Sequence, residues 1–122
     1  MKSITFTPDQ EKVFEDSIKT YGKDSQLTQT NEECTELSLA ILKYKRAEKY
    51  SDAIEIFKRR SELLNEIADV IVMTQQCVLI FGIEEIQQEV NYKLRRQRAR
   101  LDNRMNMGGS FLKKQTSEIK PL

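Results

Sequence analysis

Residues 63–81 limit the possible folds of this chain more than any other stretch, because their apolar side chains leave almost no polar face on a helix. The longest apolar run, residues 67–81, is interrupted by Asp69, Gln75 and Gln76 and is too short to span a bilayer. A helix that is apolar on nearly every side is buried. In a chain of 122 residues such burial usually requires a partner subunit, so the stretch predicts a homo-oligomer.

The remaining sequence also has the composition of helices. Glycine and proline are rare, whereas leucine, glutamate, lysine, isoleucine, arginine and glutamine dominate. We therefore predict an all-α fold with a four-helix core. The helices are expected at residues 8–21, 27–49, 53–81 and 83–104.

Capping residues mark several of these helix ends. Thr7 is suited to be an N-cap that shares a capping box with Gln10, and Gly22 is a natural stop. The third helix could be continuous from the cap at Asp52, or it could break near Arg60 so that residues 51–60 form a separate helix.

We expect residues 1–104 to form a single all-α domain. Residues 105–122 contain two adjacent glycines and a mixed polar end, and they are expected to form a flexible tail or an arm exchanged with a neighbouring subunit.

Charge and composition exclude several classes of function. A net charge of +1 provides no global field toward nucleic acid or a membrane, so neither partner is expected. The chain contains no histidine, which excludes histidine metal ligands and histidine general bases.

Its two cysteines, Cys34 and Cys77, lie in predicted helices, and the N-terminus has no apolar signal segment. A reducing, cytoplasmic location is the expectation.

Two acidic motifs at helical spacing form the candidate site. Glu32-Glu33-x-x-Glu36 lies in the second predicted helix, and Glu66-x-x-Asp69 lies in the third. Residues three or four apart share a helix face, so packing of the two helices would bring four or five carboxylates together. Carboxylates at such distances raise each other's pKa or recruit cations, and Mg²⁺ binds through a few carboxylates and substrate phosphates. The pattern predicts a Mg²⁺ site.

Each acidic motif also has a purely structural interpretation. The motif that begins at Glu32 could be a solvated helix face, and Glu66 with Asp69 could form a buried ion pair with lysine or arginine. The occurrence of both motifs together favours a site. A di-iron centre needs Glu-x-x-His motifs, and a calcium loop needs an Asp-rich loop with its glycine; neither is present.

Basic residues gather in the second half of the fourth predicted helix: Lys93, Arg95, Arg96, Arg98, Arg100 and Arg104. They could form a solvated face or bind a phosphate backbone. We favour a third interpretation, in which one face delivers two or three cations to the anionic substrate of the metal site.

The two acidic motifs resemble the signature of the MazG-like all-α nucleoside triphosphate pyrophosphohydrolases, Glu-Glu-x-x-Glu followed by Glu-x-x-Asp. The resemblance covers about residues 26–101 and includes a basic stretch, Asn91-Tyr92-Lys93-Leu94-Arg95-Arg96. Two features depart from the family pattern. The segment between Glu36 and Glu66 is long, and Gln97 stands near the place of a second arginine.

This resemblance implies a four-helix core that assembles as a dimer or a dimer of dimers. It implies hydrolysis of (d)NTP to (d)NMP and pyrophosphate with Mg²⁺, for which Mn²⁺ could substitute. The implied metal ligands are Glu33, Glu36, Glu66 and Asp69. Glu32 would support a ligand or orient the attacking water, and Glu32, Glu33 and Glu36 form the implied catalytic set. Gln29 would face the nucleotide, while Lys93 and Arg96 would hold its phosphates.

A triphosphate brings about four negative charges to these carboxylates, so at least two Mg²⁺ ions are needed for rough charge balance. Two other functions stay open from the sequence. The chain could be a catalytically silent helical module that oligomerises and binds a nucleotide or a protein. It could also be a small nucleic-acid-binding protein that uses residues 93–104.

Overall fold

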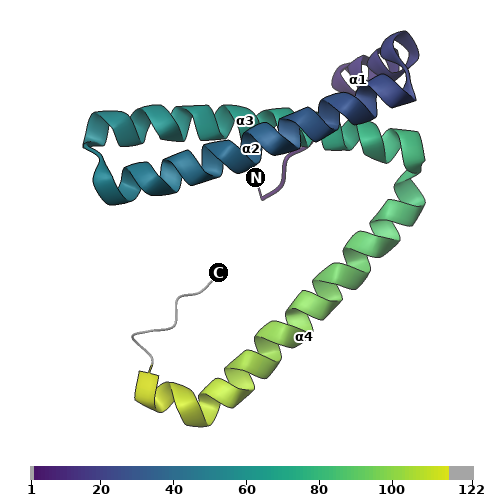
Figure 1. Ribbon diagram of the computed structural model, residues 1–122. Helices are drawn as coiled ribbons and strands as arrows, with labels where there is room; N and C mark the ends of the chain where they lie inside the picture. The colour runs from purple at the N-terminus through teal and green to yellow at the C-terminus, as the bar shows by residue number, and fades with distance from the viewer. Residues whose placement is uncertain (1, 116–122) are drawn as a thin grey trace. The chain divides into compact units, whose positions relative to one another are not determined.

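The computed structural model describes residues 2–115, with side chains described for residues 2–107. All regular structure in this part of the chain is helical, which confirms the predicted all-α class (Figure 1). The helices are α1 (Pro8–Tyr21), α2 (Lys23–Tyr50), α3 (Ala53–Phe81) and α4 (Ile83–Gln115). The chain divides into two compact units, Met1–Gly82 and Ile83–Leu122.

The start of α1 is the capping box expected from the sequence. The Thr7 hydroxyl accepts a hydrogen bond from the Gln10 backbone N–H at 3.2 Å, and the Gln10 side-chain oxygen accepts one from the Thr7 N–H at 2.9 Å. Pro8 occupies the first helical position, where it needs no N–H partner. Gly22 ends the helix at a φ of 85°, and its N–H bonds to the Ile18 carbonyl. The predicted bounds of this helix are confirmed.

The helix α2 begins at Lys23, four residues earlier than expected. Gly22 is both the end of α1 and the residue before α2, because its positive φ turns the chain without a linker. Residues 23–26, which were expected to lie before the helix, therefore form its first turn.

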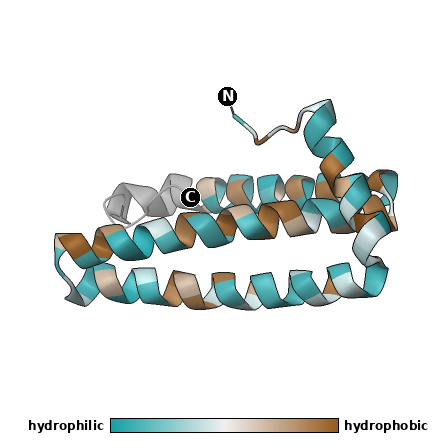
Figure 2. Cartoon of the chain, turned by 90° about the horizontal axis from the view of Figure 1, so that it is seen from above, coloured by the Kyte–Doolittle hydropathy of each residue, from teal (hydrophilic) through white to brown (hydrophobic). Residues whose placement is uncertain are grey.

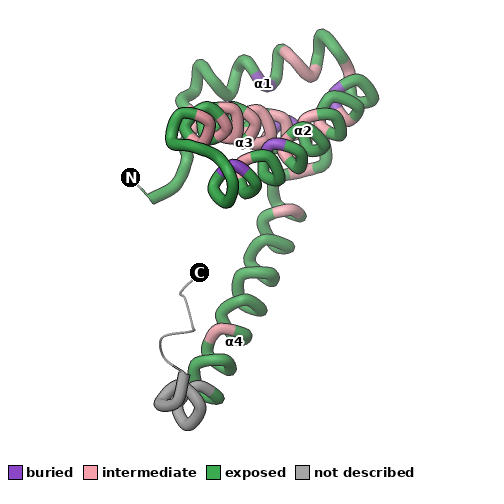
Figure 3. Tube along the Cα trace, turned by 60° about the vertical axis from the view of Figure 1, so that its left-hand side comes forward, coloured by how far each residue is buried: buried purple, intermediate pink, exposed green. Residues whose placement is uncertain are grey.

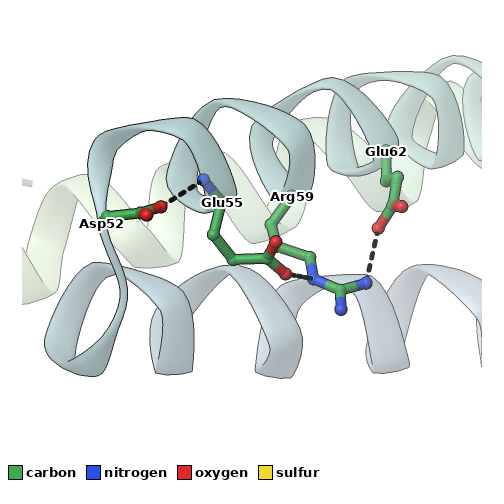
Figure 4. A network of polar contacts seen from close by, with 4 residues as sticks. All are labelled: Asp52, Glu55, Arg59 and Glu62. Carbon is green, nitrogen blue, oxygen red and sulfur yellow. Dashed lines mark hydrogen bonds and ion pairs between the residues drawn. The ribbon is translucent and has the colours of Figure 1, made fainter.

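The helix α3 is continuous, so residues 51–60 do not form a separate helix. The Asp52 side chain caps it by accepting the Glu55 N–H at 2.9 Å. Near Arg60, where the sequence left a break open, Arg59 bonds to Glu55 at 2.8 Å and to Glu62 at 3.0 Å (Figure 4). These bonds join residues before and after Arg60 along one face of the helix. Helix propensity treats residues singly, so it does not predict such side-chain bonds.

In the first unit, α2 and α3 lie side by side and run antiparallel, since only a short turn joins them (Figure 1). Buried positions recur along α2 (Figure 3), where Ala40 and Ala47 share one face and their small side chains permit close helix contact. The helix α1 contacts both α2 and α3, and its buried Phe14 packs edge-to-face on Phe6 at 5.0 Å between ring centroids.

The expected burial of α3 on every side is incomplete in the single chain. Apolar residues recur on most turns of α3 (Figure 2), yet Leu64, Ile67, Val72 and Phe81 are exposed. By length and composition alone α3 is also long and apolar enough to cross a membrane, a property that it shares with core helices of soluble proteins. Coverage of its exposed side by a second subunit stays a prediction.

The second unit contains α4, which continues to Gln115 and so extends beyond the expected end at residue 104. Residues 105–115, expected in a tail or exchanged arm, are helical, and the rest of that segment, 116–122, lies outside the described residues. Residues 87–100 are all exposed, and Arg98 pairs with Asp102 at 3.0 Å.

Candidate metal centre

The helices α2 and α3 bring three carboxylates together. Glu33 of α2 and Glu66 and Asp69 of α3 each offer one oxygen, and these oxygens lie within 4.8 Å of one another. The i,i+3 spacing places Glu66 and Asp69 on the same side of α3. All three side chains are half-buried. We call Glu33, Glu66 and Asp69 the acidic group.

Glu36 is coupled to the acidic group through Glu66. Burial raises the pKa of Glu66, and the negative charges of Glu36, Asp69 and Glu33 raise it further, as does a hydrogen bond with Glu36. A raised carboxyl pKa means that the protonated form is favoured where charges of one sign are crowded. Glu36 itself is exposed and lies at the edge of the group.

Two oxygen atoms of the acidic group lack a partner. Glu33 Oε2 and Glu66 Oε2 are both buried, and neither has a hydrogen-bond partner among the residues that the structure describes. A buried polar atom without a partner costs free energy, about 1–3 kcal/mol in mutational series. A bound cation would satisfy both atoms.

The alternative of a buried ion pair is not found for Glu66 or Asp69 among the side chains that the structure describes. The ion pairs there are Lys12–Asp16, Arg59–Glu55, Arg59–Glu62 and Arg98–Asp102. No lysine or arginine within residues 2–107 therefore forms an ion pair with Glu33, Glu66 or Asp69.

Gln29 lies one turn before Glu33 and supports it. Its Nε2 donates a hydrogen bond to Glu33 Oε1 at 2.8 Å. Glu32 is exposed and lies outside the acidic group, because adjacent residues point about 100° apart on a helix. The predicted roles of Gln29 toward the nucleotide and of Glu32 toward the water stay predictions.

Lys93 and Arg96 belong to α4 in the second unit, and both are exposed. The Arg96 guanidinium lies over the Tyr92 ring, 5.7 Å from its centroid. Their predicted contact with phosphates stays a prediction.

A cavity of about 240 Å³ adjoins the acidic group between α2 and α3. It is lined by Glu36, Leu39, Ala40, Lys43, Arg59, Glu62 and Glu66. Sequence reasoning missed Lys43, Arg59 and Glu62 as residues near the site. A signal for two of them was present, since Lys43 follows Glu36 by two turns and Glu62 precedes Glu66 by one turn.

A second polar contact between α2 and α3 lies on the other side of the acidic group. Thr30 of α2 contacts Cys77 of α3 at 3.3 Å and donates to the Gln26 carbonyl at 2.7 Å. Gln26 and Gln76 are both 5% exposed, and within the described part of the chain the Oε1 atom of each has no hydrogen-bond partner.

The donor set fits a hard divalent cation. Carboxylate oxygens are the ligands that Mg²⁺ prefers, and oxygens on opposite sides of such an ion are about 4.2 Å apart for metal–oxygen distances near 2.1 Å. Neighbouring oxygens around such an ion are only about 3.0 Å apart, and three oxygens include at least two neighbouring pairs. The oxygens of the acidic group lie within 4.8 Å of one another, so Glu33, Glu66 and Asp69 would have to approach one another to coordinate the ion. Comparison with protein families, with curated proteins and with solved structures found no match.

Proposed function

We propose that this protein is a Mg²⁺-dependent nucleoside triphosphate pyrophosphohydrolase of the MazG-like all-α type, which hydrolyses (d)NTP to (d)NMP and pyrophosphate. The observation that carries the proposal is the acidic group on two facing helices, with buried unpartnered oxygens on Glu33 and Glu66. An unbalanced group of this kind costs stability, which is unusual unless function requires it.

Four carboxylates would hold the metal. Glu33, Glu66 and Asp69 supply the converging oxygens, and Glu36 adds a fourth carboxylate from the cavity side. Bound Mg²⁺ would lower the pKa of a coordinated water and offset the charge of the phosphates, and Mn²⁺ could replace it.

The side chains of the chain have three tasks in this reaction. Gln29 fixes the orientation of Glu33. Glu36, with Glu32 beside the group, would orient the attacking water and accept its proton. Lys93 and Arg96 would bind phosphates. As the water oxygen bonds to a phosphorus, the phosphoanhydride bond breaks and pyrophosphate leaves with the electron pair.

We also propose a homodimer or a dimer of dimers in the cytoplasm. Exposed apolar side chains on α2 and α3 support this assembly: Leu39, Leu42, Leu64, Ile67 and Val72. Contact with a second copy would remove them from water, and obligate interfaces of this apolar kind usually bury more than about 2,000 Å².

The test is incubation of the purified protein with Mg²⁺ and each of the common (d)NTPs, followed by separation of the products. The proposal predicts equal amounts of monophosphate and pyrophosphate. Release of diphosphate and inorganic phosphate would contradict it. Tight Mn²⁺ and nucleotide binding without any turnover would also contradict it, and would favour the silent binding module.

A further inference from the structure

We propose that the cavity between α2 and α3 receives the pyrophosphate end of the triphosphate, and that Lys43 Nζ binds its phosphate oxygens. This inference rests on the proposed function and assigns a substrate-binding role to a residue outside the acidic motifs. The cavity shares Glu36 with the edge of the acidic group and Glu66 with the group itself, so a substrate held by the carboxylates through a metal would adjoin this space.

The size of the cavity fits part of a nucleotide. Sites for whole drug-sized ligands usually measure about 300–1,000 Å³. This cavity, at about 240 Å³, is smaller, so its volume suits a pyrophosphate group better than a complete nucleotide. Among the described residues that line it, Leu39 and Ala40 are the apolar ones, and neither offers an aromatic surface on which a base could stack.

Lys43 is placed on the correct side of α2 to reach this space. It follows Glu36 by seven residues, which is nearly two full turns and about 10 Å along the axis. Both residues line the cavity. A chain of phosphates that starts at the metal would therefore run along α2 toward Lys43.

The two cationic side chains that line the cavity, Arg59 and Lys43, differ in their ion pairs. Arg59 donates through Nε to Glu55 and through Nη1 to Glu62, so two carboxylates already balance its charge (Figure 4). Lys43 forms no ion pair with any described residue. It is the cation of this cavity that is available to an anion, and lysine commonly binds phosphate as a point charge.

The carboxylates of the cavity make this binding dependent on metal. Glu36, Glu62 and Glu66 would repel a free phosphate group. Mg²⁺ at the acidic group would reverse this field. The structure also allows a simpler role, in which Lys43 only offsets the negative charge of the carboxylates around the cavity. The two roles predict different effects of a Lys43 substitution on the affinity for pyrophosphate.

The experiment compares Lys43→Ala with Lys45→Ala, an exposed lysine on a different side of α2. Pyrophosphate binding is measured by calorimetry at saturating Mg²⁺, and metal binding by titration with Mn²⁺ alone. We expect Lys43→Ala to weaken pyrophosphate binding by about tenfold to a hundredfold, as for loss of a charge-assisted contact. Lys45→Ala should change it less than about twofold, in keeping with the small effects of surface substitutions. Lys43→Arg should restore most of the affinity, and Mn²⁺ should bind Lys43→Ala at least as tightly as the wild type.

Unchanged pyrophosphate affinity in Lys43→Ala would overturn the inference, and so would equal losses in both alanine variants. If Lys43 only offsets charge, Lys43→Ala will tighten Mn²⁺ binding and leave pyrophosphate affinity as it was. The proposed function fails by a different result, namely absence of monophosphate and pyrophosphate from wild-type reactions. A wild type that turns over substrate but does not bind pyrophosphate would refute the cavity assignment alone.

Discussion

Gln29 donates a hydrogen bond to one carboxylate oxygen of Glu33 at 2.8 Å, and the other oxygen of Glu33 is buried without a partner. The bond limits the rotation of the Glu33 carboxylate. Residues that orient metal ligands in this way affect metal affinity although they do not touch the ion.

The first prediction concerns this bond. Gln29→Ala should weaken Mn²⁺ binding by about tenfold to a hundredfold, because loss of such support typically has effects of this size. Titration with Mn²⁺ in the absence of nucleotide measures it, with Thr28→Ala as a control at an exposed neighbouring position. Unchanged Mn²⁺ affinity combined with a raised KM would instead indicate that Gln29 contacts the nucleotide.

The second prediction concerns pH and stability without metal. The pKa of Glu66 is raised by burial and by its acidic neighbours, so the folded protein binds this proton more tightly than the unfolded chain. Ionisation of Glu66 therefore costs stability, and this contribution grows as pH rises from the ordinary carboxyl pKa to the raised one. We expect Glu66→Gln to raise Tm at neutral pH in EDTA and to lose this advantage in acid. The exposed Glu89→Gln serves as control, and an equal shift there would show a general charge effect.

The third prediction separates the carboxylates inside the acidic group from the one at its edge. Asp69→Asn should abolish both Mn²⁺ binding and turnover, because Asp69 supplies one of the converging oxygens. Glu36→Gln should abolish turnover while it retains a larger share of Mn²⁺ affinity, since Glu36 lies outside that group. Equal loss of Mn²⁺ affinity in the two variants would place Glu36 among the main ligands. Wild-type turnover in either would remove the site assignment.

Local sequence signals were sufficient for the fold class and for the start of α1. Thr7, Gln10 and Gly22 act within a few residues of one another, so their geometry follows from the sequence alone. The sequence did not decide whether α3 continues past Arg60. The bonds of Arg59 to Glu55 and Glu62 accompany this continuity, and they involve side-chain positions that propensity does not contain.

The candidate site was predictable only to the level of helix faces. The spacing of Glu66 and Asp69 placed them on one side of a helix. Which residues face Lys43 depends on the register between α2 and α3, and this register is set by tertiary packing. The Gln29–Glu33 bond depends on side-chain rotamers, which helical periodicity does not contain.

The fourth prediction concerns assembly. A charge in place of an exposed apolar side chain of α2 or α3 should dissociate the oligomer, because burial of an unpaired charge is costly. We expect Val72→Glu and Leu42→Glu to reduce the mass measured by light scattering to that of the 14.3 kDa chain. Val13→Glu, also exposed but on α1, should leave the mass unchanged. A wild-type protein that is monomeric at micromolar concentration would refute the proposed dimer.

The last prediction concerns α4. Lys93 and Arg96 lie three residues apart on one face, whereas Arg98 pairs with Asp102. If Lys93 binds phosphates, Lys93→Ala should lower kcat/KM by about tenfold to a hundredfold, as expected for loss of a charge-assisted contact worth about 1.5–3 kcal/mol. Mn²⁺ affinity should not change, because the acidic group lies on α2 and α3. Arg98→Ala should have little effect on kcat/KM, since its ion pair is solvent-exposed. Equal losses in the two variants would mean that the basic residues of α4 act as a diffuse positive field, and no loss in either would remove α4 from substrate binding.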